Sequence, residues 1–491
     1  MAKQYIIIVF ILILNIASYF LFLRIDFTND KKYTLSESTK KIIKNLNQEI
    51  QINVYFSENL PPDFARIKTD IKDLINEYAI KSSNNIKFKF INPFENEKFE
   101  KEAIENGIAP VLIDVREKNQ LKQQKAYFGL TITNNKGQKE VIPIIQPETS
   151  YEYFITLSIK KLTITNKTII GLLQGNGEPD IYAIKELYNN LSALYEIENI
   201  ELNNNSDIPK HIKTLLIISP KDSFSQNNFN TLDNFLRKGN NIFIAYNSVD
   251  ANPEAQYAFP VYNNFQNWLK QKGIIVKNNF IIDKNCMPIV FTQNQSGYPV
   301  KSTINFPLIP ILTKFSNHPV NTGIQSVVFE FASQCLPNNK NNVKFIPLIK
   351  TSDKSGIINP PFQFDLLKNW TDTDFPLSNI TVAAILEGKI VGNKNSKIVF
   401  ISDGDFVING VGQNTIKINE DNIHLTANII DWLSGSTELF HIRTKEIKYR
   451  PLISLPDKTK NIIKYFNFIF PILLIIIYGI IRQEKNKMKK N

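Results

Sequence analysis

The sequence predicts an α/β protein with one transmembrane helix at each end and two folded domains between them. Strand-like and helix-like segments alternate through most of the 491 residues, and this alternation is typical of parallel sheets. An apolar run lies near each end of the chain, at residues 5–23 and 462–481. Hydrophobic residues make up 43% of the chain, which is sufficient for several buried cores and argues against disorder.

The two apolar runs predict membrane anchors. Residues 5–23 would form a helix about 28 Å long, which spans the hydrocarbon of a bilayer. The run continues past Ser18 without a small-residue cleavage site, so a retained anchor is favoured over a cleaved signal peptide. For residues 462–481 the alternative is a buried core helix. As transmembrane helices, both runs would contact membrane lipid directly.

The charged tail predicts the orientation of the chain. Lys and Arg residues that flank a membrane helix tend to remain cytoplasmic, and a cationic tail starting at Arg482 follows the second run. For a bacterium, we therefore expect both termini in the cytoplasm, the helices in the inner (cytoplasmic) membrane and the central domains in the periplasm. The tail also contributes to the net charge of +11. Because no nucleic-acid motif accompanies that charge, we expect no nucleic-acid partner.

The first domain, at residues 33–148, is predicted as a compact α/β module. Ser36 is a candidate N-cap for its first helix, because Ser accepts hydrogen bonds from free N–H groups at helix starts. Apolar spacing then predicts a helix at 33–45, a strand at 50–56, a helix at 63–79, a strand at 86–91, a helix at 97–106 and hairpin strands at 127–133 and 140–145. This order resembles a thioredoxin-like fold. The domain has no Cys-x-x-Cys pair, which excludes redox catalysis there.

A larger parallel-sheet domain is predicted at residues 166–445, after a helix at 150–162. Strands are expected at 168–173, 214–218, 241–245 and 397–402, with helices at 181–194, 225–237 and 424–432. Strands that alternate with helices at this spacing form parallel sheets. Residues from about 252 to 392 are irregular and rich in strand-like segments. They are interpreted as an insertion that covers one edge of the sheet.

A glycine turn follows the first strand of this domain, where Gly175, Asn176, Gly177 and Glu178 precede a helix. Glycines in such a turn let backbone N–H groups approach a phosphate at a helix start. The third position of the dinucleotide fingerprint is Asp180, however, which places a negative charge where a pyrophosphate would lie. The turn is therefore either a ligand-binding loop or a tight strand-to-helix connection.

Two carboxylates, Asp403 and Asp405, follow the late strand at 397–402. They could present oxygens to a hard cation or another polar ligand at the carboxyl end of the sheet. A turn that caps a helix explains them equally simply, and the sequence identifies no further metal ligands. We therefore treat both as candidate ligand-binding residues and predict no metal site.

Cys286 and Cys335 are the two cysteines of the chain, and both fall in the insertion. The oxidising side of the membrane would permit a disulfide between them, although spacing alone does not bring two Cα atoms together. The four histidines are dispersed, and no serine-hydrolase, zinc-protease or Walker A motif is present. We therefore expect no cofactor and no enzymatic activity, with any ATP hydrolysis supplied by another subunit.

The order of short motifs resembles the GldG family, the auxiliary (substrate-binding) proteins of ABC transporters associated with bacterial gliding motility. The resemblance covers almost the whole chain, and its motifs are Tyr33-Thr34-Leu35-Ser36, Val54-Tyr55-Phe56, Leu60-Pro61, Phe90-Ile91-Asn92-Pro93 and the segments at 172–179, 235–245 and 401–406, between the two apolar ends. The family often has a His in the glycine turn, where this chain has Asn176, so no role of that His transfers. The sheet domain also resembles a glutamine-amidotransferase-like (flavodoxin-like) fold without its catalytic Cys and His.

The resemblance implies a non-enzymatic component of an inner-membrane transport complex, with an ABC permease subunit and a cytoplasmic ATPase subunit as partners. Two alternatives stay open. A periplasmic enzyme could use Glu178, Asp403 and Asp405, because paired carboxylates perform acid–base chemistry. A scaffold for a cell-surface motility or secretion machine would instead work through contacts alone.

Overall fold

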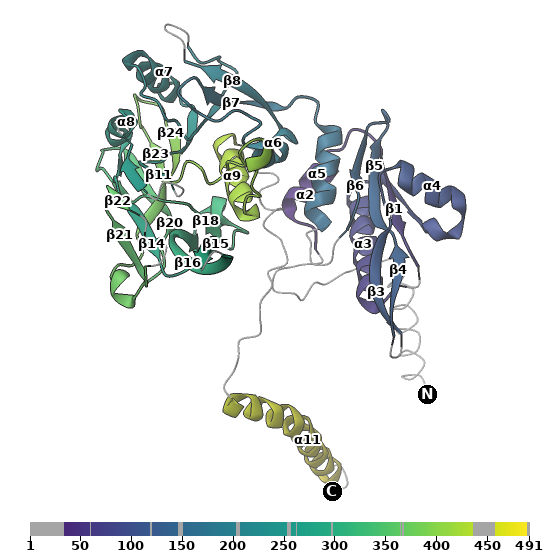
Figure 1. The fold of residues 1–491 in the computed structure, drawn as a ribbon. Helices are drawn as coiled ribbons and strands as arrows, with labels where there is room; N and C mark the ends of the chain where they lie inside the picture. Colours follow the sequence, from purple (N-terminus) through teal and green to yellow (C-terminus); the bar gives the residue numbers. More distant parts are fainter. Residues whose placement is uncertain are drawn as a thin grey trace. The chain divides into compact units, whose positions relative to one another are not determined.

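The computed structural model of the chain confirms the mixed α/β class. It describes residues 34–58, 60–117, 120–145, 151–202, 207–252, 257–261, 263–295, 298–363, 365, 368–435 and 457–488. Residues 1–446 and 447–491 form two compact units. In the first unit, a small sheet is built from early segments of the chain and a large sheet from later ones (Figure 1).

The early segments form a four-stranded sheet in the order β2-β1-β5-β6. Strand β1 (Ile50–Phe56) pairs parallel with β2 (Ile86–Ile91) and antiparallel with β5 (Phe128–Asn134), which pairs with β6 (Lys139–Ile142). Helices α2 (Glu37–Lys44), α3 (Pro62–Lys81) and α4 (Glu97–Glu105) and the short η1 (Pro93–Glu95) connect these strands. An additional hairpin, β3 (Val111–Glu117) with β4 (Gln120–Ala126), is absent from the sequence prediction because β4 is almost entirely polar.

Helix α5 (Tyr151–Thr163) is tied to this module by buried polar contacts. The Glu152 carboxylate accepts hydrogen bonds from the N–H of Ser36 (2.7 Å) and from the Thr39 hydroxyl (2.6 Å). The Tyr78 hydroxyl donates to the carbonyl of Glu152 (3.0 Å). Ser36 also caps α2 as predicted, since its hydroxyl accepts from the N–H of Thr39. Because buried polar groups need partners, these contacts hold α2, α3 and α5 in one arrangement.

The large sheet has eight strands in the order β17-β20-β23-β24-β10-β9-β7-β8. A parallel half is formed by β7 (Thr168–Gln174), β8 (Tyr195–Glu201), β9 (Thr214–Ile218), β10 (Asn241–Ala245) and β24 (Ser396–Ile401). Its order, β8-β7-β9-β10-β24, is that of flavodoxin-like sheets. Strands β23 (Thr381–Gly388), β20 (Val343–Lys350) and β17 (Lys314–Phe315) extend the sheet in antiparallel pairs. The parallel strands expected from the sequence are confirmed, and β8 is an addition to them.

Helices cover both faces of the large sheet. On one face, α6 (Lys185–Ser192) and α9 (Glu420–Leu433) contribute Leu187 and Ile430 to the core. On the other face, α7 (Gln226–Arg237) and α8 (Phe265–Lys272) contribute Leu232 and Leu269. Every residue of β9 is buried, which is expected for a central parallel strand covered on both sides.

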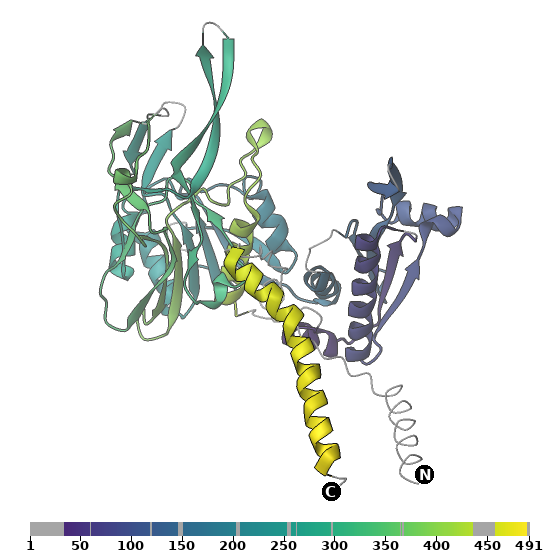
Figure 2. The same ribbon diagram turned by 90° about the horizontal axis from the view of Figure 1, so that it is seen from below.

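The predicted insertion is rich in short strands. It contains β11 (Val249–Asn252), β12 (Tyr257–Pro260), β13 (Ile274–Val276), β14 (Phe280–Asp283), β15 (Cys286–Gln295), β16 (Tyr298–Leu312), β18 (Val327–Val328), β19 (Cys335–Pro337), β21 (Ser355–Ile358), β22 (Phe362–Gln363) and the short helices η2 (Pro319–Asn321) and η3 (Asp372–Asp374). Strands β15 and β16 form the long hairpin at the top of Figure 2. A further short helix, η4 (Gly412–Asn414), precedes α9. Because β17 and β20 join the large sheet, the insertion extends one edge of that sheet.

The predicted membrane anchors need correction. Among the described residues, no helix combines the length and the apolar character needed to cross a membrane. The predicted span at 462–481 lies in α11 (Asp457–Met488), where Lys464, Asn467 and Pro471 interrupt the apolar run. The predictions of a C-terminal transmembrane helix, and of an inner-membrane location with both termini cytoplasmic, are therefore wrong on this finding. The apolar run at residues 5–23 lies outside the described residues.

Candidate functional site

The glycine turn lies where the order of the parallel strands reverses. The chain passes from β7 outward to β8 and then returns to β9 on the other side of β7. In open parallel sheets, ligands bind outside the carboxyl ends of the strands at such a switch point. Here the switch point is bounded by the segments that follow β7 and β9, at residues 175–184 and 219–225.

The two loops at the switch point are hydrogen-bonded directly to each other. The carbonyl of Asn176 accepts from the N–H groups of Lys221 (3.0 Å) and Asp222 (2.9 Å). The side-chain amide of Asn176 donates to the carbonyl of Ser223 (3.4 Å). Gly177 has a φ of +83°, and a Cβ added there would lie 3.0 Å from the Cβ of Lys221. Glycine is therefore required here by the left-handed backbone and by the close approach of the two loops.

Glu178 turns back into its own loop. Its Oε2 accepts a hydrogen bond from the N–H of Asn176 (2.6 Å), and its Oε1 is buried without a partner among the described residues. Burial raises the pKa of Glu178, and the nearby carboxylate of Asp222 raises it further. Glu178 thus takes up an N–H group of the turn that a ligand would otherwise use. This geometry is that of a tight strand-to-helix connection. A ligand-binding role for Gly175, Asn176, Gly177 and Glu178 stays a prediction.

Asp403 and Asp405 lie on the same edge of the sheet, in the loop after β24. Asp403 is fully buried, and its carboxylate accepts from the N–H groups of Glu330 (2.6 Å) and Asp405 (2.8 Å). Burial, together with the charge of Asp405, raises the pKa of Asp403 well above its usual range. The Asp405 carboxylate accepts from the Ser219 hydroxyl (3.1 Å) and the Asn247 amide (2.6 Å). The two carboxylates thus join the loops that follow β9, β10 and β24.

Glu330 is brought to this edge by the insertion, and no motif in the sequence points to it. It lies 73 residues before Asp403 in the chain. Its side chain reaches solvent and has no hydrogen-bond or ion-pair partner among the described residues. The surrounding protein atoms partly desolvate the Glu330 carboxyl, and this desolvation raises its pKa. The negative charge of Asp405 raises that pKa further. Glu330 and Asp405 line an open pocket of about 940 Å³ whose apolar wall includes Ile309 and Phe406.

The structure forms neither a disulfide between the two cysteines nor, in the part of the chain that it describes, a metal centre. Both cysteines are free thiols. Cys335 pairs with Val276 in the β13–β19 ladder, whereas Cys286 pairs with Pro310 in the β15–β16 ladder. Burial raises the pKa of Cys286 to about 11. No three His, Cys, Asp or Glu side chains are placed to hold a metal ion among the described residues.

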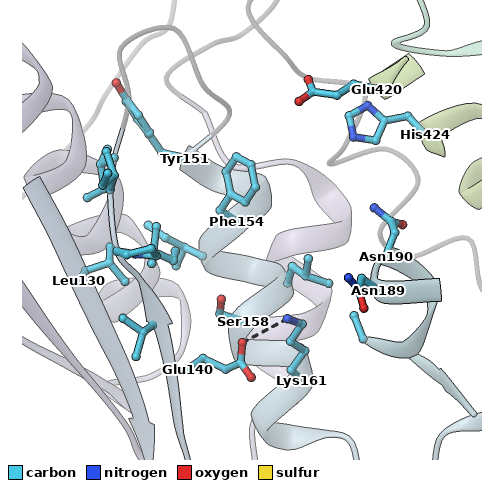
Figure 3. Close-up of a pocket in the computed structure, with 18 of the residues that line it drawn as sticks. Leu130, Glu140, Tyr151, Phe154, Ser158, Lys161, Asn189, Asn190, Glu420 and His424 are labelled. Atoms are coloured by element: carbon cyan, nitrogen blue, oxygen red, sulfur yellow. Dashed lines mark hydrogen bonds and ion pairs between the residues drawn. The ribbon is translucent and has the colours of Figure 1, made fainter. Parts of the chain in front are cut away.

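A second pocket, which we name the α5 groove, runs along helix α5 (Figure 3). It has a volume of about 830 Å³ and is lined by β6, residues 143–145, α5, α6 and the first turn of α9. Lys161 and Glu140 form an ion pair in it, with 3.2 Å between Nζ and Oε2. Tyr151 and Phe154 contribute aromatic rings from α5, and Asn189 contributes a carboxamide from α6. No sequence motif marks this groove, because its residues come from six separate segments.

These features define a mixed α/β protein with a flavodoxin-like sheet, a smaller α/β module, and open pockets lined by carboxyl, carboxamide and apolar side chains. The chain belongs to the family of auxiliary proteins described as "ABC-type uncharacterized transport system", which matches residues 167–435. A second family, a domain of unknown function, matches residues 29–133. The protein is therefore an auxiliary component of an ABC-type transport system.

Individual proteins are also similar to the chain. An uncharacterized protein of Borreliella burgdorferi is 26% identical over 511 residues, covering 98% of this chain and 96% of that protein. The solved N-terminal domain of mmIFT52 has a TM-score of 0.36 at 14% identity, over 54% of this chain and 96% of that one. A ThuA-like protein from Parabacteroides merdae has a TM-score of 0.29 at 12% identity, over 59% and 95%. The similarity to the Borreliella protein extends over nearly the whole length of both chains.

Proposed function

We propose that this chain is a non-catalytic auxiliary subunit that works with a permease subunit and an ATPase subunit, both supplied by other chains. The family match supports this proposal because it covers the large sheet domain from β7 through α9. The observation that carries the non-catalytic part is how the candidate acids are used. Asp403 and Asp405 accept hydrogen bonds from two backbone N–H groups, a hydroxyl and an amide of their own chain. Carboxylates engaged in this way position loops.

Recovery of the complex tests the partnership. Cells that express the tagged full-length chain are cross-linked and solubilised in mild detergent, and co-purified proteins are identified by mass spectrometry. We expect a multi-spanning permease and an ATPase with a Walker A motif, both enriched over cells carrying the tag on an unrelated protein. Repeated recovery of the chain without either subunit would contradict the proposal.

The enzyme alternative makes a different prediction for Asp405→Asn. This variant removes the charge from the candidate acid and keeps its size. If the acids only position loops, the variant protein should support the same transport phenotype as the wild type in a deletion strain. Loss of the phenotype, with undiminished recovery of permease and ATPase, would favour acid–base chemistry at this site. The matched control is Asp222→Asn, on the neighbouring loop.

A role in gliding motility is the finer part of the proposal, and it rests on the order of the GldG-like motifs. In a gliding host, deletion of the gene should abolish gliding in time-lapse images, and the wild-type gene should restore it. A deletion strain that glides normally would remove gliding from the proposal. The assignment to an ABC transport system would be unaffected by that result.

A further inference from the structure

We infer that the α5 groove binds an amphipathic amine, that is, an apolar body carrying a protonated amino or guanidinium group. The inference deepens the proposed function, because a binding groove supplies an auxiliary subunit with something to present to its permease. It rests on three observations: an exposed apolar wall, an opposite wall with carboxylates that form no ion pair with a described residue, and a hydroxyl that no described residue binds.

The apolar wall exposes side chains that usually lie buried. Ile144 is 45% exposed and Phe154 is 42% exposed, and both line the groove. Tyr151 lies along the same helix as Phe154 in Figure 3. A groove of about 830 Å³ falls in the range of pockets that enclose small ligands, which are mostly lined by apolar and aromatic residues. Covering this wall with an apolar body would remove its area from water.

The opposite wall favours a positive charge on the ligand. Glu186 lies in the first turn of α6 and Glu420 begins α9, and both side chains line the groove. Neither carboxylate forms an ion pair with another described residue. The cation on the other side, Lys161, is already neutralised by Glu140 at 3.2 Å. The groove is therefore negative overall, which disfavours a phosphate or carboxylate ligand.

Ser158 contributes a hydroxyl to the groove. The residue is only 7% exposed and lines the groove, yet its hydroxyl has no hydrogen-bond partner among the described residues. Figure 3 places it beside the ion pair of Lys161 and Glu140. The hydroxyl oxygen is not one of the fully buried atoms, so a polar atom of a ligand in the groove can reach it. The carboxamides of Asn189 and Asn190 offer further donors and acceptors across the groove.

Binding is tested by calorimetric titration of the purified full-length chain, without its partner subunits. The probes are phenylbutylamine and an acetylated tripeptide amide of leucine, phenylalanine and lysine. Their neutral analogues are phenylbutanol and the same tripeptide with norleucine in place of lysine. We expect at least one cationic probe to bind about tenfold more tightly than its neutral analogue, and its affinity to fall as salt is raised. Binding of the tripeptide alone would identify a peptide source, and binding of the amine alone a small lipophilic amine.

Matched variants separate the groove from general effects of mutation. Glu420→Gln and Phe154→Ala should each weaken the cationic probe at least threefold, and Ser158→Ala should weaken both a probe and its neutral analogue. The controls are Glu105→Gln and Ile104→Ala, at exposed positions on α4, which should leave affinity unchanged. Circular dichroism and the melting temperature report whether each variant is folded.

The inference is overturned if neither cationic probe binds, if neutral analogues bind equally well, or if folded Glu420→Gln binds like the wild type. Each of these results would leave the recovery of permease and ATPase by the tagged chain untouched. Conversely, a chain that binds the probe but recovers no permease would contradict the proposed partnership and leave the groove in place.

Discussion

At the scale of single residues, desolvation and a neighbouring charge raise the pKa values of the acids at the carboxyl edge of the sheet. Asp403 has no exposed surface, and both Asp403 and Glu330 face the charge of Asp405. Each carboxyl therefore binds its proton more tightly in the folded chain than in the unfolded chain. Such groups favour folding while they are protonated and lose that contribution as the pH rises through the raised folded pKa.

Glu330→Gln should accordingly stabilise the protein at neutral and higher pH. Glu330 has no hydrogen-bond partner to lose among the described residues, and the substitution removes its repulsion with Asp405. Near pH 4, about the unfolded pKa of a glutamate, the variant and the wild type should have nearly the same urea midpoint. By about pH 8 the variant should have the higher midpoint. An exposed strand position, Glu196→Gln, serves as the control, and equal midpoints of the Glu330 variant and wild type at both pH values would contradict the argument.

At the scale of elements, an ion pair with a buried lysine joins the two helices that cover one face of the large sheet. Asp233 on α7 lies 2.6 Å from the Nζ of Lys272 on α8 and accepts a hydrogen bond from the indole N–H of Trp268 (2.9 Å). The Lys272 side chain is only 5% exposed. Removal of one partner from a buried pair leaves an uncompensated charge, which costs more than the pair itself contributes.

Asp233→Ala should therefore reduce the free energy of unfolding by about 3–5 kcal/mol, as measured by urea denaturation. The matched control is Asp207→Ala, because Asp207 pairs with Lys238 at 2.8 Å while both side chains are about half exposed. An exposed pair contributes about 0–1 kcal/mol. If the two variants lose the same stability, then burial of Lys272 is not the source of the effect.

At the scale of the whole molecule, separate cores support the proposal of a thioredoxin-like domain at 33–148 and an amidotransferase-like domain at 166–445. Ile71 packs in a core built from the small sheet and its helices. Leu232 packs in a core built from the large sheet, α7 and α8. Helix α5 contributes to both sides, since Ile159 belongs to the first core and Tyr153 to the core under α6 and α9. The boundary between the two proposed domains therefore lies near α5.

Hydrogen exchange tests this division. Ile71→Ala and Leu232→Ala each remove a fully buried side chain and should cost about 2–5 kcal/mol. We expect the first variant to speed amide exchange in β1 and β5 and to leave β9 and β10 protected, and the second to do the reverse. Faster exchange in both sheets for both variants would show one cooperative unit, and the two-domain proposal would fail.

Much of the secondary structure follows from the sequence alone. The ranges 50–56, 86–91, 214–218 and 241–245 are strands in both the prediction and the structure, because apolar runs of that length reflect burial against a sheet. The N-cap at Ser36 is equally local. Strand β4 could not be found in this way, since it is held by pairing with β3 and not by an apolar face. Helix α9 begins earlier than predicted, at Glu420, because Asn419 caps it.

The site itself depends on contacts between distant segments. From the sequence, the glycine turn and the pair of Asp403 and Asp405 could be placed after strands of a parallel sheet, which lays them along one edge. Only the tertiary structure joins Asn176 to the loop after β9 and brings Glu330 against Asp405. The α5 groove likewise exists only where six segments meet. Hydropathy and capping are properties of neighbouring residues, whereas a pocket and the charge inside it arise when chain segments far apart in sequence exclude water together.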